Sequence, residues 1–291
     1  MIARLLVLSL LAGLALPALA QNAPPAPAPA TAASSGKTPL QVSADNGVEW
    51  QKDTKLYIAR GNAVATRGDM RVRADTLTAH YRDVAGGKTE IYRVDAVGGV
   101  VLKQGDGTAT GGQAIYDVDN RSLNLTGGNL TYSTNDSKIT AQKSLEYYDG
   151  KHMAVARGSA VAVRGSDQVQ ADVLTGYFTD GGGKRSLSRI DASGNVVVTS
   201  NQNVAHADAG TYDPNTKIAT LTGNVHITRG NDQLLGERAE VNMNTGTYKL
   251  LPGAKGGRVT GVIQPDQNLN NNAPATGNPP ATGKAPGKSK P

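Results

Sequence analysis

The chain has 291 residues, a formal net charge of +6 and no cysteine, with a single Trp and a single Phe. The lack of cysteine excludes disulfide scaffolds and thiol nucleophiles, so burial and backbone pairing must hold the fold together. Arg4 carries +1 and residues 253–291 carry +4, which leaves +1 for the rest of the chain. With so few aromatic side chains to stack on bases, the sequence predicts no nucleic-acid partner.

Residues 1–20 have the pattern of a secretory signal peptide. A positive charge at Arg4 precedes an apolar run from Leu5 to Leu16, and the small residues Ala18 and Ala20 indicate cleavage after Ala20. The run is shorter than the roughly 20 residues that a membrane-spanning helix needs, so a retained anchor is the less favoured alternative. We therefore expect an exported mature protein.

Two polar segments flank the central body of the chain. Residues 21–39 are mostly Pro, Ala and Ser, and residues 264–291 have similar composition with Asn added. Such segments bury too little apolar surface to offset the entropy of ordering, so we expect a disordered linker and a disordered tail. The folded domain is expected over residues 40–263.

A glycine-led apolar phrase recurs through this body. It reads GNAVAT at 61–66, GSAVAV at 158–163, GNVVVT at 194–199 and GNVHIT at 223–228. Longer stretches also repeat: residues 95–128 resemble residues 191–224 at an offset of 96, and residues 71–81 resemble 168–178 at an offset of 97. We therefore expect the body to consist of two copies of one structural unit, arranged in tandem by an internal duplication.

Each phrase alternates apolar and polar positions. Val225 and Ile227, for example, flank His226. A period of two is typical of half-buried β-strands, and turn signals at short intervals favour hairpins over a parallel solenoid. The sequence thus predicts an all-β, antiparallel fold in which each phrase glycine permits a strand to bend. The phrase at Gly127 is an exception, because its expected apolar positions are Asn129 and Thr131.

The sequence contains no recognisable catalytic constellation. The histidines lack the spacing of metal ligands, and Asp75, Asp172 and Asp208 recur with the repeat, which favours a structural role over a catalytic pair. We therefore expect no enzymatic activity, no cofactor and no metal. The four histidines are His80, His152, His206 and His226. The arginines at phrase edges, namely Arg60, Arg67, Arg157, Arg164 and Arg229, are interpreted as solvated strand charges, with contact to an anionic head group as the alternative.

The alternation of A-D-x-x-x-x-x-Y stretches with G-N-V-x-[IVL]-x phrases, followed by RVTGVIQP at 258–265, resembles the OstA family of lipopolysaccharide transport proteins, in its LptA branch. The resemblance spans about residues 43–265. It implies an open, V-shaped β-jellyroll built from the internal duplication, with an apolar groove that holds the acyl chains of lipid A. The groove-lining residues would be Val72, Val100, Leu102, Leu123, Leu125, Val169, Ile190, Val196, Val198, Leu221, Val225 and Ile227.

The resemblance also implies a location in the periplasm and a set of partners. Edge strands would join the chain end to end with itself, with an LptC-like protein of the inner membrane and with an LptD-like protein of the outer membrane. The edges are expected in residues 40–50 at one end and in 238–249 with 258–263 at the other. The alternative is an exported β-repeat scaffold or adhesin with a packed core and no lipid ligand.

Overall fold

The computed structural model describes residues 40–181, 184–200, 203–253, 256 and 258–262. The expected signal peptide, linker and polar tail lie outside these residues. Within them, no helix has the length and apolar character needed to cross a membrane.

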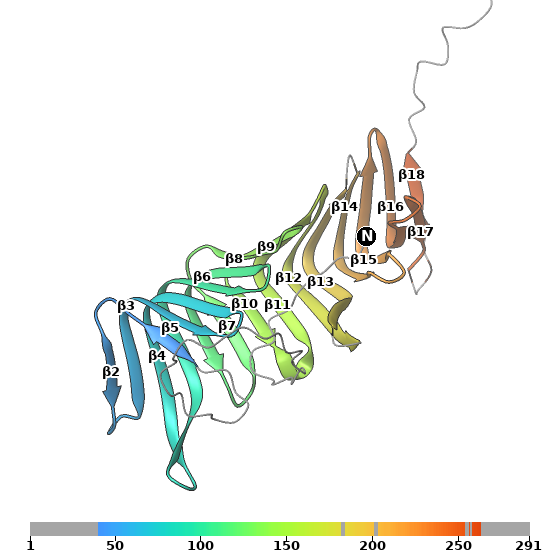
Figure 1. Cartoon of the computed structure of the whole chain (residues 1–291). Helices are drawn as coiled ribbons and strands as arrows, with labels where there is room; N and C mark the ends of the chain where they lie inside the picture. The colour runs from blue at the N-terminus through green and yellow to red at the C-terminus, as the bar shows by residue number, and fades with distance from the viewer. Residues whose placement is uncertain (1–39, 182–183, 201–202, 254–255, 257, 263–291) are drawn as a thin grey trace, which may run out of the picture.

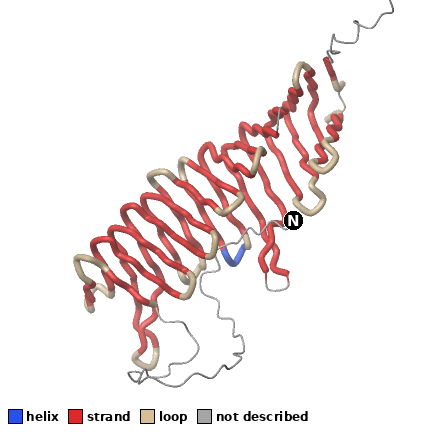
Figure 2. The backbone as a smooth tube through the Cα atoms, turned by 45° about the horizontal axis from the view of Figure 1, so that its top comes forward, coloured by secondary structure: helices blue, strands red, loops and turns tan. Residues whose placement is uncertain are grey.

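The described residues form one sheet of 18 strands, in which every paired strand runs antiparallel to its neighbour. Figure 1 shows an elongated body with β2 at one end and with β17 and β18 at the other. The all-β, antiparallel architecture expected from the sequence is therefore confirmed. Figure 2 shows that strands make up most of the described backbone, with a short helical turn near its middle.

The first half of the body contains ten strands. The long strands β3 to β6 pair in chain order, the short strands β1 and β2 both pair with β3, and the short strands β7 and β8 both pair with β6. Their bounds are β1 Gln41–Ser43, β2 Val48–Gln51, β3 Leu56–Arg67, β4 Met70–Val84, β5 Lys88–Gln104, β6 Gly107–Asp117, β7 Ser122–Thr126, β8 Leu130–Ser133, β9 Ser137–Ala141 and β10 Ser144–Tyr148.

The second half repeats this pattern after a single turn of 3₁₀ helix. That turn is η1, Asp149–Lys151, and the following strands are β11 Met153–Arg164, β12 Asp167–Gly181, β13 Lys184–Ser200, β14 Asn203–Asp213, β15 Ile218–Arg229, β16 Asp232–Asn242, β17 Thr247–Leu251 and β18 Thr260–Val262. The expected strand over 238–249 is interrupted at residues 243–246, where the chain turns from β16 into β17.

The phrase glycines mark the places where the long strands bend. The pairing register shifts between Arg60 and Ala63, between Val97 and Val100, and at the equivalent places in β11, β13 and β15. Gly98 has a φ of +83° and Gly194 of +74°, a region that side-chain-bearing residues rarely adopt. The predicted bends are therefore β-bulges, each with one extra residue.

The recurring aspartates support these bulges. A Cβ at Gly98 or Gly194 would collide with the carboxylate of Asp75 or Asp172, so these positions have room only for glycine. Asn195 donates a hydrogen bond to Asp172 over 2.9 Å, and Asn224 donates one to Asp208 over 2.8 Å. The aspartates thus have the structural role that their recurrence indicated.

The line of bulges divides the sheet into two walls. We call wall A the strand segments on one side of the bulges together with β2, β7, β10 and β17, and wall B the segments on the other side together with β1, β8, β9 and β18. Inward side chains of both walls belong to a single cluster of buried apolar residues. The space between the two walls is therefore the interior of the molecule.

Candidate functional site: the apolar interior and its ends

The structure places most of the predicted groove-lining residues in this interior. Val100, Leu102, Leu123, Leu125, Val196, Leu221, Val225 and Ile227 are buried. Val72, Val169, Ile190 and Val198 are half-buried. Val72, Val169 and Val198 pack directly against the buried cluster.

The buried cluster runs through both halves of the chain without a break. It extends from Ala59 in β3 to Ala239 in β16 and crosses the junction at Leu125 and Tyr147. About half of its buried members are alanine. Because an alanine buries only one methyl group, these walls lose little apolar contact if they move apart.

Sequence reasoning missed Leu130, one of the most completely buried side chains. The period-two count from Gly127 placed Asn129 and Thr131 inward. Gly127 and Gly128 both have positive φ and lie between β7 and β8, so the strand breaks there and the alternation resumes one residue later. The paired glycines were the available signal for this shift.

A narrow apolar cleft lies between the two walls near the C-terminal end. Wall B contributes Val198, Ala205 and Ile227, and wall A contributes Leu221, Val241 and Tyr248, among others. Its volume is about 30 Å³, well below the roughly 300 Å³ at which pockets for organic ligands begin. Asn203 of wall B donates a hydrogen bond to the hydroxyl of Tyr248 in wall A over 3.0 Å. In this state the walls are closed over the cleft.

Two of the arginines at the phrase edges form ion pairs with carboxylates of neighbouring strands. Arg60 contacts Glu49 at 2.6 Å and Arg157 contacts Glu146 at 2.9 Å. These partners support the interpretation of solvated strand charges, each worth little to stability at the surface.

The histidines do not come together in a site. His80 hydrogen-bonds Asp95 over 2.7 Å, and His206 lies opposite His226 across the β14–β15 pair. Among the described residues, no group of three or more potential ligands has the arrangement of a metal site.

A buried ionic cluster joins the two halves of the chain. Asp149 in η1 is 4% exposed and accepts hydrogen bonds from Arg185 over 2.8 Å and from Tyr147 over 3.0 Å, and Arg121 also pairs with it. Burial alone would raise the pKa of Asp149, but the hydrogen bonds from Arg185 and Tyr147, together with the charge of Arg121, outweigh burial and lower the pKa.

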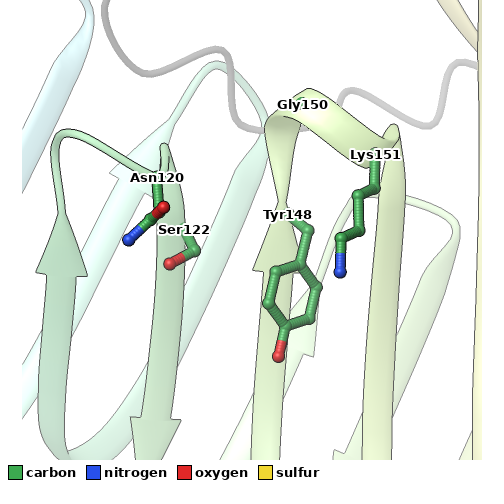
Figure 3. Close-up of a pocket in the computed structure, with 5 residues that line it drawn as sticks. All are labelled: Asn120, Ser122, Tyr148, Gly150 and Lys151. Atoms are coloured by element: carbon green, nitrogen blue, oxygen red, sulfur yellow. The ribbon is translucent and has the colours of Figure 1, made fainter.

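A polar recess lies beside this cluster, between the turn that precedes β7 and the end of β10 (Figure 3), and its volume is about 300 Å³. Asn120, Ser122, Tyr148, Gly150 and Lys151 line it. The Lys151 ammonium lies 5.2 Å from the centre of the Tyr148 ring. The recess opens on the outside of the junction, and none of its lining side chains belongs to the apolar interior.

An uncharacterized protein of Rhizobium meliloti is 28% identical over 145 residues, which is 47% of this chain and 77% of the relative. The crystal structure of LptH from Pseudomonas aeruginosa, the LptA-homologous periplasmic component of the lipopolysaccharide transport device, matches with 17% identity and a TM-score of 0.39, over 44% of this chain and 95% of LptH.

The model of the family described as "LptA/(LptD N-terminal domain) LPS transport protein" matches this chain twice, at residues 41–148 and at residues 138–247. The two matches confirm the internal duplication and together cover most of the chain. The chain therefore belongs to the LptA/LptD N-terminal family of lipopolysaccharide transport proteins.

Proposed function

We propose that this protein is a periplasmic lipopolysaccharide carrier that forms part of a bridge from the inner to the outer membrane. Family membership supports this proposal. The single observation that carries it furthest is the continuous apolar interior, which extends across both repeats. Acyl chains of lipid A would lie between the two walls, in contact with residues such as Leu102, Val198 and Ile227.

Lipid entry requires the walls to separate, because the cleft near the C-terminal end holds about 30 Å³. The alanine-rich walls favour such opening, since separation exposes only small side chains and an entering acyl chain covers them again. Each methylene so buried contributes about 0.8 kcal/mol. The hydrogen bond from Asn203 to Tyr248 closes one end of the path and would break on opening.

The open ends of the sheet suit assembly into a bridge. Backbone groups of a terminal strand can pair with a further strand from another molecule. Val48 and Trp50 of β2 and Val262 of β18 are more than half exposed, so both ends also present apolar side chains. The expected partners are further copies of this chain and LptC-like and LptD-like proteins of the two membranes.

Export to the periplasm belongs to this proposal. Residues 1–20 have the composition of a cleavable signal peptide. We expect the energy for directional transport to come from a partner protein, as membership in the transport family implies.

Native mass spectrometry of the protein purified from the envelope of its own source tests the carrier proposal. We expect a population whose mass exceeds that of the chain by one lipopolysaccharide or lipid A molecule. Release of this mass by detergent would show that it is held noncovalently. A chain that carries no lipid under these conditions would favour the packed β-repeat scaffold.

A further inference from the structure

The junction between the two repeats is built from four short strands placed between two long ones. On one side, β7 and β8 pair with the long strand β6. On the other side, β10 and β9 pair with the long strand β11. The junction closes where β7 pairs with β10 and β8 pairs with β9.

The N-terminal end of the molecule repeats one side of this junction. Adding 97 to the residue numbers of a pair at this end gives a pair at the junction. The pair Val48–Ala59 corresponds in this way to Leu145–Ala156. The pair Val42–Ala65 corresponds to Ile139–Ala162. The strands β2 and β1 therefore correspond to β10 and β9. Among the described residues, β2 and β1 have no strands in the places that β7 and β8 take beside β10 and β9, and Trp50 is 60% exposed whereas its counterpart Tyr147 is 8% exposed.

The C-terminal end repeats the other side. Adding 125 to the residue numbers of a pair between β6 and β7 gives a pair between β16 and β17. The pair Gln113–Thr126 corresponds in this way to Arg238–Leu251, and the pair Asp117–Ser122 corresponds to Asn242–Thr247. The second short strand is paired in the equivalent way, since Leu235 pairs with Thr260 as Thr110 pairs with Thr131, although Thr260 lies 129 positions after Thr131 instead of 125. The strands β17 and β18 therefore correspond to β7 and β8.

The two ends of the chain thus carry the two complementary sides of the junction that the chain already contains. We propose that a second copy of this chain docks its β2–β1 end on the β17–β18 end of the first, in the pairing register of the internal junction. The proposal deepens the end-to-end assembly suggested above and rests on it, and it specifies which residues meet.

The register follows from the pairs inside the chain. The internal pair Leu145–Leu125 predicts that Val48 of one copy lies opposite Leu250 of the other. The internal pair Tyr147–Leu123 likewise predicts that Trp50 lies opposite Tyr248. Both new pairs are apolar and lie on the inner face. Glu146 opposite Asn124 becomes Glu49 opposite Lys249, which places opposite charges on the outer face. The apolar interiors of the two copies would then be continuous.

The ionic cluster of the internal junction has no counterpart between copies. The position of Asp149 corresponds to Lys52 at one end, and that of Arg121 corresponds to Gly246 at the other. Buried ion pairs therefore stabilise the internal junction. The interface between copies, which we call the joint, depends instead on backbone pairing and apolar contacts. Assembly between copies should accordingly be reversible and depend on concentration.

Disulfide trapping tests the register, and the absence of natural cysteine removes any background. Equal amounts of the V48C chain and the L250C chain are mixed and oxidised gently. We expect a cross-linked dimer at least five times more abundant than in either variant alone, because only the mixture brings the two ends together. The Q51C and T247C chains form a second matched pair at exposed or half-buried positions, where a loss of fold is least expected.

The register-shifted control mixes V48C with Y248C. A shift of two residues moves the partner Cα by about 7 Å along the strand, beyond the reach of a disulfide between facing strands. Equal cross-linking in the shifted and matched mixtures, or none in either matched pair, would overturn the proposal. Lipid detected on the same samples by native mass spectrometry would show that the carrier function survives even if this register fails.

Trp50 provides an independent readout, because it is the single Trp of the chain and lies in the proposed joint. We expect its fluorescence emission to shift to shorter wavelength as the protein concentration rises, since the joint would cover the ring. An emission spectrum that stays constant while sedimentation shows oligomers would place the contact elsewhere.

Discussion

Replacing Val198 with Asp is expected to reduce retained lipid at least tenfold while the protein remains folded. Val198 is half-buried and lines the cleft between the walls, so its side chain would lie directly against an acyl chain. An unpaired carboxylate in an apolar environment costs several kcal/mol, far more than the contact that one valine supplies. Native mass spectrometry of variant and wild-type protein purified in parallel measures the ratio of lipid-bound to free chain.

The matched control is Val197→Asp, the same substitution one residue earlier on β13. Val197 lies on the opposite face of the strand, where its neighbours across the sheet are Gln170 and His206. This variant should retain lipid at the wild-type level, and circular dichroism should show the same strand content for both variants. Equal losses in the two variants would mean that the lipid does not lie between the walls.

Replacing Asp149 with Ala should lower the free energy of unfolding by about 3 kcal/mol, because it leaves the guanidinium groups of Arg185 and Arg121 without their buried partner. Urea denaturation followed by circular dichroism measures the change. Asp83→Ala is the control: Asp83 pairs with Lys55 at 2.6 Å, but both side chains are well exposed, so its loss should cost no more than about 1 kcal/mol.

The contribution of Asp149 should also depend on pH. Its pKa is lower in the folded state than the ordinary value of about 3.9 in the unfolded chain. A carboxyl group of this kind stabilises the fold fully above the unfolded pKa, and the contribution is lost as the pH falls through the folded pKa. The stability difference between wild type and Asp149→Ala should therefore be constant near pH 7 and shrink below about pH 4. A difference that grows on acidification would contradict this assignment.

The architecture was largely accessible from the sequence because it depends on local patterns. Alternation in the phrases around Val100, Val196 and Val225 specified strands, and the glycines preceding them specified the bends. Repetition at offsets of 96 and 97 specified the duplication, which the two family matches confirm. Membership in a family of transport proteins likewise confirms the expectation of a non-enzymatic role.

Features that depend on contacts between distant residues were not accessible in this way. The Asp149 cluster brings together Arg121 and Arg185, which are separated by 64 positions and share no motif. The inward position of Leu130 required the exact conformation of two consecutive glycines, and a one-residue shift reverses the face of every following side chain. The division of the expected strand 238–249 into β16 and β17 also depended on the turn at residues 243–246, which allows β17 to pair back onto β16.

The central claim is that lipopolysaccharide occupies the space between the walls, and site-specific photo-crosslinking tests it most directly. A photoreactive residue replaces Leu102 or Ile227 on the inner face, or Lys103 or Arg73, which are exposed on the outer face, and the cells are irradiated before purification. We predict that lipopolysaccharide is captured from the two inner positions and not from the two outer ones. Equal capture from both sets, or capture from Lys103 and Arg73 alone, would contradict the account.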